Sequence, residues 1–268
     1  MPSFRDSVAV MQSLPSPAEL DVLADRGWPS VQRESLGPWT LRFASGVTNR
    51  ANSVLPTGRV DAESLPATLA AAERAYRDRG LPTVFQVSPA TDPALVSALA
   101  ARGYREHSDT LVLVADRAAV ASAGASTPGA PTPIAPTPSR AWMDLWWSVD
   151  GRGNADAEAV AERILTGGPA LYASAGDPEH PDAVARLAIV GVWGGVFAVA
   201  TRPDQRRRGH AAAIVRALAA DAERHGIRHL WLQVTAANSP ARALYDRLGF
   251  VGASRYAYWT EPATEPTR

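Results

Sequence analysis

The sequence of 268 residues contains no cysteine, which excludes disulfide bonds, a thiolate nucleophile and zinc held by cysteine. It also contains no lysine, so the 27 basic residues are all arginine. A phosphate-binding loop that needs lysine and a Schiff-base lysine are therefore excluded. The 27 acidic residues balance the arginines, so no net charge draws the whole protein to nucleic acid or to an anionic membrane.

Long hydrophobic runs are missing as well. The N-terminal stretch MPSFRDSVAVMQSLPSPAEL has no basic region followed by an apolar segment, and no window has the length of a membrane span. His225 and His229 have the i, i+4 spacing of metal ligands, but Gly226 ends the helix between them. The sequence therefore predicts a soluble, cytoplasmic, globular protein without a metal site, long enough to bury a core.

The composition changes at the segment RAAVASAGASTPGAPTPIAPTPSR, which is rich in Ala, Ser, Thr and Pro. It has almost no large apolar side chain and so indicates a linker. We therefore predict an N-terminal domain over residues 1–116, a linker over residues 117–139 and a C-terminal domain over residues 140–268.

Helical and strand patterns alternate in the C-terminal half. An aromatic amphipathic stretch opens it, and short apolar runs indicate buried strands between helical segments. The last pattern, ASRYAYWT, alternates in the manner of an edge or hairpin strand. The expected strands are residues 169–176, 183–193, 194–201, 229–236 and 253–260, and the expected helices are residues 155–168, about 210–225 and 238–250.

The N-terminal half repeats the end of this order. Residues 79–114 run parallel to residues 225–260, with Gln86 opposite Gln233 and Pro93 opposite Pro240. A repeat of this length indicates tandem domains and not a solenoid. We therefore predict an internal duplication with two similar α/β units.

The stretch RPDQRRRGHAAAIV follows the expected strand that ends near Thr201 and leads into a helix that starts near His210. The first turn of a helix leaves backbone N–H groups free and carries partial positive charge. Gly209 lets these groups approach an anion without a Cβ in the way. Arginines oppose the dipole of a free helix at this position, but they suit a bound polyanion. The segment therefore favours a phosphate-bearing cofactor.

Two motifs then indicate a family. The spacing Arg206-x-x-Gly209-x-Ala211 fits the R/Q-x-x-G-x-G/A element of the GNAT N-acetyltransferase superfamily. The segment NSPARALYDRLGF resembles the second signature of that superfamily, the N-x-x-A-x-x-L-Y-x-x-x-G-F helix. The chain resembles tandem, duplicated actinobacterial-type members with a degenerate N-terminal copy. This resemblance implies an α/β (α+β) fold of two GNAT-like units, each a mixed, mostly antiparallel sheet flanked by helices.

The resemblance also implies acetyl-CoA as acyl donor and no metal. The amine of a small molecule would attack the thioester directly in a ternary complex, and a backbone N–H of the central strand would stabilise the oxyanion. Asn238 would contact the pantetheine arm, and Tyr245 would protonate the departing thiolate. The backbone at the end of the central strand would pair with the arm, and the loop after it would bind the pyrophosphate. The residues concerned are Val199, Ala200, Thr201, Arg206, Arg207, Arg208, Gly209, His210, Ala211 and Ala212.

Each assignment has an alternative. The arginines could form a solvated loop or meet nucleic acid, although the neutral total and the lack of interleaved aromatic residues disfavour a nucleic-acid partner. Asn238 could be only a helix cap, and Tyr245 could be a core tyrosine. A non-catalytic acyl-CoA-binding or sensing module is the main alternative to an enzyme. We expect no membrane partner, and a monomer or homodimer.

No motif marks the general base or the acceptor site. Asp150 is a candidate base, or simply a turn residue. Trp142, Trp146 and Trp147 could line the acceptor site, although core packing is the better interpretation for at least one of them. His210 is interpreted as a helix-start residue and not as a catalytic one.

The N-terminal half lacks the cofactor motifs. No R-x-x-G-x-G lies between its strand near Trp39 and its helix near Leu65. The repeat places Thr91 where Asn238 stands, and Ala98 or Leu99 where Tyr245 stands. We expect this copy to bind no CoA and to pack against the active copy. Its polar segment TNRANS, residues 48–53, could reach the acceptor site.

Overall fold

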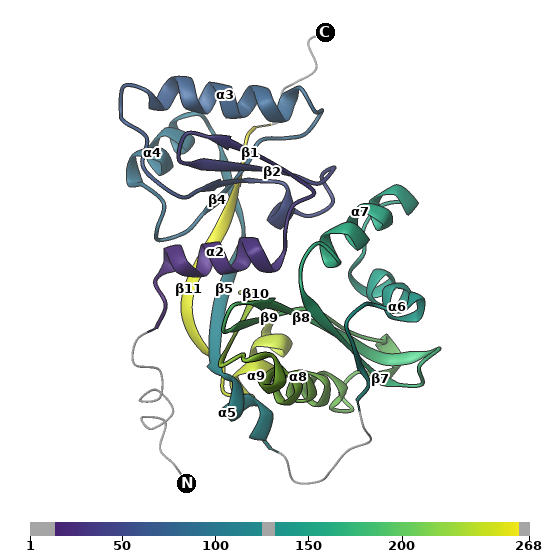
Figure 1. The fold of residues 1–268 in the computed structure, drawn as a ribbon. Coiled ribbons are helices and arrows are strands. Elements are labelled where there is room, and N and C mark those ends of the chain that lie inside the picture. The colour runs from purple at the N-terminus through teal and green to yellow at the C-terminus, as the bar shows by residue number, and fades with distance from the viewer. Residues whose placement is uncertain (1–13, 125–131, 263–268) are drawn as a thin grey trace.

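The fold is built on one sheet of eleven strands with helices on both faces (Figure 1). It is known from a computed structural model that describes residues 14–124 and 132–262. The strand order is β1-β2-β3-β4-β11-β5-β10-β9-β8-β7-β6. Only the β3–β4 and β9–β10 pairs are parallel. The predicted mixed, mostly antiparallel sheet flanked by helices is confirmed, and the two units share it as one continuous sheet.

The first half contains a capped helix, a hairpin and a strand–helix–strand unit. Helix α2 is closed by a capping box between Ser16 and Glu19, which satisfies backbone groups at its start. Side-chain caps also start α4 and α5, at Asp92 and Asp116. The elements are α2 (Pro17–Gly27), β1 (Gln32–Leu36), β2 (Trp39–Phe43), the 3₁₀ turn η1 (Asn49–Ala51), β3 (Val54–Pro56), α3 (Leu65–Arg77), β4 (Val84–Val87), α4 (Pro93–Ala101), β5 (Arg105–Asp116) and α5 (Arg117–Ser122).

The second half follows the predicted order of helices and strands. Ser139, Asn154 and Asn238 cap α6, α7 and α9 through their side chains. The elements are β6 (Ile134–Ala135), α6 (Arg140–Asp150), α7 (Ala155–Leu165), β7 (Ala170–Gly176), β8 (Pro181–Val190), β9 (Trp193–Thr201), the 3₁₀ turn η2 (Pro203–Gln205), α8 (His210–Asp221), the 3₁₀ turn η3 (Ala222–His225), β10 (His229–Thr235), α9 (Ser239–Arg247) and β11 (Val251–Thr260).

The final strand of each half lies inside the other half. Strand β11 pairs with β4 and β5 of the first half, and β5 pairs with β10 and β11 of the second. Figure 1 shows the yellow β11 running beside the teal β5. The expectation that residues 253–260 form an edge or hairpin strand was therefore wrong. Alternation reports which side chains are buried, and it carries no information about which strands lie alongside.

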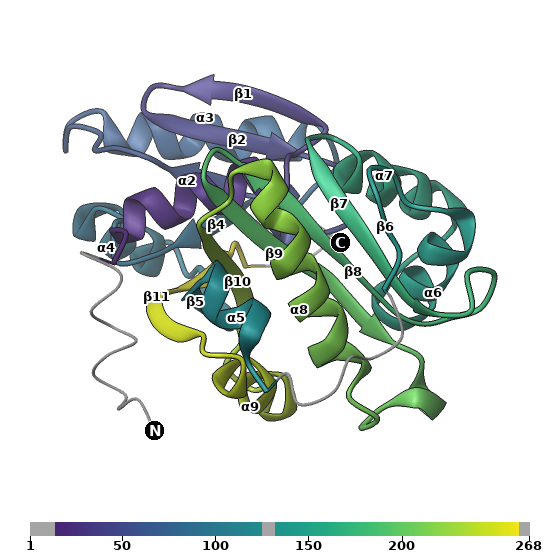
Figure 2. The same ribbon diagram turned by 60° about the horizontal axis from the view of Figure 1, so that its bottom comes forward.

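Two apolar cores cover the two faces of the sheet in the second half. One core lies under α6 and α7 and contains Trp142, Phe197 and Trp231. The other lies under α8 and α9 and contains Leu218 and Tyr245. Helix α8 crosses the sheet on this second face, and α5 lies against it (Figure 2).

Helix α2 of the first half packs directly on three strands of the second half, β8, β9 and β11. Its last residue, Gly27, permits this approach. A Cβ at Gly27 would lie 2.7 Å from the Trp231 ring and 2.9 Å from the Phe197 ring, closer than packed carbon atoms allow. The N-terminal copy therefore packs against the C-terminal copy, as predicted.

The predicted linker begins with a helix. Val120 of α5 is fully buried, although alanine and serine surround it in the sequence. Residues 125–131 of the predicted linker lie outside the described residues. The division into domains at residues 116 and 140 stays a prediction. Among the described residues, no helix is long and apolar enough to cross a membrane.

Candidate active site

The site begins where two parallel strands separate. Strand β10 pairs with β9 only from His229 to Leu232, opposite Trp193 to Val196. Both strands continue further, β9 to Thr201 and β10 to Thr235. The edge of β9 that faces β10 therefore has no ladder partner over residues 197–201. These backbone groups can pair with an extended ligand that enters as an added strand.

A β-bulge lies at the start of this open edge. The register between β8 and β9 shifts after Arg186 pairs with Phe197 and before Val184 pairs with Ala200. Ala198 has φ +51°, an uncommon conformation for a residue with a side chain. Bulges redirect backbone groups out of the ladder and occur often beside active sites. The predicted stretch Val199, Ala200 and Thr201 thus follows directly after a point where the backbone is redirected.

The loop after β9 presents backbone N–H groups at the start of α8. Arg207 and Gly209 both have positive φ, at +62° and +87°. Gly209 is the N-cap of α8 and provides no side-chain hydrogen bond. The N–H groups of His210, Ala211 and Ala212 therefore lie in a first turn without a side-chain cap, unlike those of α6, α7 and α9. Such a turn fits an anion such as a pyrophosphate.

The arginine side chains of this loop point into solvent. Arg206, Arg207 and Arg208 are exposed, and Arg206 donates only a long hydrogen bond, 3.5 Å, to the carbonyl of Thr201. Arg202 instead forms ion pairs with Asp182 at 3.2 Å and with Asp204 at 2.8 Å. The three consecutive arginines form no ion pair among the described residues and remain free for a bound anion.

Asn238 and Tyr245 lie on α9 with different local roles. The side-chain oxygen of Asn238 accepts a hydrogen bond from the Ala241 N–H at 3.2 Å, so Asn238 is a helix cap. Tyr245 is 8 % exposed, and its ring lies 5.8 Å from that of Phe250. Burial raises the pKa of Tyr245 to about 12. The phenol is therefore protonated at neutral pH and can act as a proton donor.

The three tryptophans of α6 differ in their surroundings. Trp142 is buried and donates a hydrogen bond to the carbonyl of Ala173, so it is a core residue. The Trp146 ring lies 6.4 Å from that of Trp28, which the sequence did not single out. Trp147 is partly buried against Trp146, at 5.9 Å between the rings. Asp150 is exposed at the last residue of α6.

The polar segment of the first half, residues 48–53, reaches this region. Arg50 of η1 lies over the Trp28 ring, 5.4 Å from its centroid, and over the Phe197 ring, 5.5 Å from its centroid. Phe197 is the residue of β9 where pairing with β10 has ended. Tyr256, Tyr258 and Asp150 all act on the pKa of Arg50, which places them nearby. Side chains from both halves thus meet where β9 leaves β10.

The family described as "Probable histone acetyltransferase Rv0428c C-terminal" matches residues 18–259, most of the chain. The chain belongs to this family. It is an acetyltransferase of the GNAT kind. Uncharacterized N-acetyltransferase YobR of Bacillus subtilis (strain 168) is 26 % identical over 247 residues, which cover 90 % of this chain and 96 % of the relative.

Solved structures show the same fold. The GCN5-related N-acetyltransferase from Kribbella flavida has a TM-score of 0.69 at 16 % identity and covers 94 % of this chain and 98 % of that one. A tandem GNAT protein from the clavulanic acid biosynthesis pathway has a TM-score of 0.65 at 14 % identity, covering 97 % and 93 %. The resemblance to tandem GNAT proteins drawn from two motifs is therefore confirmed.

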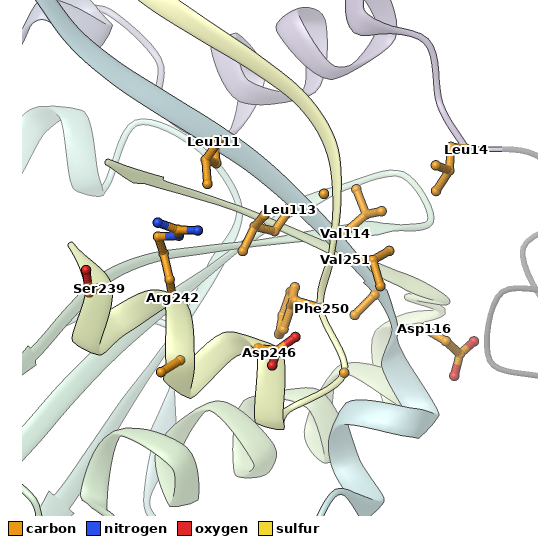
Figure 3. Close-up of a pocket in the computed structure, with 14 residues that line it drawn as sticks. Leu14, Leu111, Leu113, Val114, Asp116, Ser239, Arg242, Asp246, Phe250 and Val251 are labelled. Carbon is orange, nitrogen blue, oxygen red and sulfur yellow. The ribbon is translucent and has the colours of Figure 1, made fainter. Parts of the chain in front are cut away.

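A hollow of about 1060 Å³ lies between α9, β5 and the start of β11 in this acetyltransferase. Figure 3 shows Arg242 and Asp246 of α9 beside Leu113 and Phe250. No residue of the loop after β9 lines it, and neither does Tyr245. The second GNAT motif, residues 238–250, therefore forms one wall of this hollow, but none of the predicted cofactor residues lines it.

Proposed function

We propose that this GNAT protein transfers an acetyl group from acetyl-CoA to the amine of a small molecule. The open edge of β9, which continues into the uncapped start of α8, carries this proposal. It offers strand-like pairing for a pantetheine arm and free N–H groups for a pyrophosphate in one continuous path. The GNAT family uses acetyl-CoA, and the residues along this path fit that donor.

The residues take the following roles in the proposal. Val199, Ala200 and Thr201 bind the arm through their backbone, and residues 206–212 bind the pyrophosphate. Asn238, while capping α9, contacts the arm. A neutral amine attacks the thioester carbonyl carbon, and a backbone N–H at the β9 bulge stabilises the oxyanion.

The proton transfers complete the reaction. The carbon–sulfur bond breaks, and Tyr245 gives its proton to the sulfur. The proton lost by the amine passes to a base, for which exposed Asp150 is the candidate. The match of Tyr245 to the tyrosine of the second GNAT motif supports this assignment, and its phenol carries the proton at neutral pH.

Isothermal titration with acetyl-CoA tests the donor, and release of free CoA thiol over a panel of amines tests the transfer. We expect one acetyl-CoA per chain and thiol release that depends on an amine. A folded protein that binds no acetyl-CoA would contradict the proposal. Binding without thiol release for any amine would indicate an acyl-CoA-sensing module instead.

A further inference from the structure

Two arginines, one buried and one half-buried, lie against one aromatic ring in the candidate active site. The guanidinium carbon of Arg50 is 5.5 Å from the Phe197 ring centroid, and that of Arg186 is 5.8 Å from it. Arg50 comes from η1 of the first half and Arg186 from β8 of the second. Two like charges in an apolar environment are costly unless an opposite charge offsets them.

Neither arginine forms an ion pair within the described ranges, 14–124 and 132–262. The Nε atoms of both are buried without a hydrogen-bond partner. Arg186 donates through Nη1 to the carbonyl of Gly27 at 2.7 Å. The fold does supply partners elsewhere: the fully buried Arg42 bonds to Asp25 at 3.4 Å and to Gln86 at 3.0 Å, as well as to Ser53. Around Phe197, Arg50 interacts with the Tyr256 hydroxyl and Arg186 with that of Tyr172, so both guanidinium groups have neutral partners in place of a paired carboxylate.

Other buried donors in this region also lack acceptors. The indole Nε1 of Trp231 and that of Trp146 have no hydrogen-bond partner. The Trp231 ring lies 6.0 Å from Phe197, and Trp146 contacts Trp28, whose ring is 5.4 Å from Phe197. Indole and guanidinium N–H groups can only donate. Asp150 acts on Arg50 electrostatically, but among the described residues no carboxylate lies within ion-pair distance of either guanidinium.

The phosphates of CoA do not supply a paired negative charge for these arginines in the proposed arrangement. Phe197 and Trp231 belong to the core beneath α6, whereas α8, whose start would hold the pyrophosphate, covers the opposite core. Burial acts to lower the pKa of Arg50, but Tyr256, Tyr258 and Asp150 outweigh burial and raise it. Arg50 is therefore cationic at neutral pH. It is also partly exposed, whereas Arg186 is 1 % exposed, so a ligand can reach Arg50.

We propose that the acceptor is an amine that carries a carboxylate, and that Arg50 binds this carboxylate. The inference rests on the proposed acetyl transfer where β9 leaves β10. A planar guanidinium matches two carboxylate oxygens, and Arg186 adds positive potential behind the Phe197 ring. The buried rings of Trp28 and Phe197 hold the Arg50 guanidinium in position. The first half of the chain thus supplies the residue that selects the substrate.

The first experiment compares amino acids with their carboxamides as acceptors, by acetyl-CoA-dependent thiol release. We expect the wild type to prefer acids at least about tenfold in kcat/KM, as for a charge-assisted contact. Arg50→Gln should remove the preference mainly through KM, and Arg50→Lys should retain part of it. Arg79→Gln is the matched control, because Arg79 also lies over a ring, that of Phe43, but forms an ion pair with Glu34. Equal use of acids and amides by the wild type would overturn the inference.

The second experiment needs no turnover. Thermal unfolding is followed with N-acetylated amino acids, which would be the products, with their amides, and with inorganic phosphate. We expect the acids to raise the Tm of the wild type and not that of Arg50→Gln. Amides or phosphate that stabilise as well as the acids would overturn the carboxylate assignment, as would acids without effect on a protein that acetyl-CoA stabilises. Failure of acetyl-CoA itself to bind refutes the proposed function instead.

Discussion

The two halves differ most at the starts of their corresponding helices, α3 and α8. The chain enters α3 through Asp61-Ala62-Glu63-Ser64 and enters α8 through Arg206-Arg207-Arg208-Gly209. At α3, the N–H groups of Ser64 and Leu65 both donate to the carbonyl of Asp61. Neither helix has a side-chain cap, but the loop before α8 has two residues with positive φ. The start of α3 is acidic and pairs its first N–H groups with the backbone, whereas the start of α8 is basic.

The proposal places the cofactor site in the second half alone, and the parallel strand pairs of the two halves differ in the same sense. The parallel pair of the first half, β3 and β4, is joined at Val54 and Phe85, and β3 has only three residues. Beside it, buried polar groups bond to one another: Gln86 donates to Asp21 at 3.1 Å and accepts from Arg42 at 3.0 Å. The second half keeps a longer β9 with an open edge. In the first half these polar groups bond to one another, whereas the backbone of β9 has no ladder partner over residues 197–201 on its β10 side.

Cutting the chain between the halves should have the largest effect. Residues 132–268 expressed alone lack β5, which separates β10 from β11, so we expect no cooperative unfolding and no acetyl-CoA binding. Co-expression with residues 1–124 should restore a folded complex. Size-exclusion chromatography and circular dichroism measure both outcomes. A folded, CoA-binding C-terminal fragment would support independent domains instead.

The phenol hydroxyl of Tyr245 has no counterpart in the first half, where the repeat places Ala98 or Leu99. Tyr245→Phe should lower kcat by about 10²–10⁴-fold, the usual range for a lost general acid, while the Kd for acetyl-CoA stays the same. Steady-state kinetics and titration separate the two effects. Unchanged kcat would leave Tyr245 as a core residue.

The pH dependence of kcat also tests the assignment of Tyr245 as general acid. The pKa of Tyr245 is raised to about 12 from an ordinary value of 10, so the folded state holds the proton more tightly than the unfolded state. The resulting stability is present below pH 10 and is lost as the pH rises through 12. Activity should therefore show no loss assignable to Tyr245 between pH 7 and about pH 10. A fall in kcat over that range in the wild type that is absent in Tyr245→Phe would contradict the raised pKa.

Reversing the charges at α8 makes its start resemble that of α3. The triple variant Arg206→Glu, Arg207→Glu, Arg208→Glu should weaken acetyl-CoA binding by about 10- to 100-fold, because charge-assisted contacts to the phosphates become repulsive. The reciprocal variant Asp61→Arg, Glu63→Arg should leave one bound acetyl-CoA per chain. Titration calorimetry gives both affinity and stoichiometry. Two bound acetyl-CoA molecules in the reciprocal variant would show that charge alone separates the halves.

A single alanine should give the smallest effect. Gly209→Ala forces a side chain into φ +87° and should cost about 1–2 kcal/mol of unfolding free energy, with acetyl-CoA binding weakened several-fold. Gly80→Ala is the matched control, since Gly80 has φ +64° and, like Gly209, has open space where a Cβ would lie. It should lose similar stability without any change in acetyl-CoA affinity. Equal effects of the two variants on affinity would show that the loop conformation does not matter for binding.

Local patterns predicted the family and most elements of the second half, but not α2 and β1, nor α5 and β6 within the predicted linker, nor how the halves join. Apolar periodicity and the Asn238–Pro240 helix start located α9, because these signals depend on neighbouring residues. The alternation in β11 could not reveal that its neighbours are β4 and β5, since strand pairing depends on distant segments. Trp28, Phe197 and Arg186 carried no motif, and only folding brings them together. Arg50 lay within a segment expected near the acceptor site, but its contact with Phe197 could not be foreseen.

Because β5 and β11 each pair with strands of the other half, part of the folding must follow the synthesis of both halves. Strand β4 cannot complete its pairing until residues 251–260, more than 160 positions further along the chain, have left the ribosome. Until then, the sheet of the N-terminal half is incomplete. The contacts between β4 and β11 join residues far apart in the sequence, and such long-range contacts slow folding. Unpaired strand edges in such an intermediate are exposed to aggregation. The first unit is thus completed by β11, a strand that follows all the other described strands along the chain.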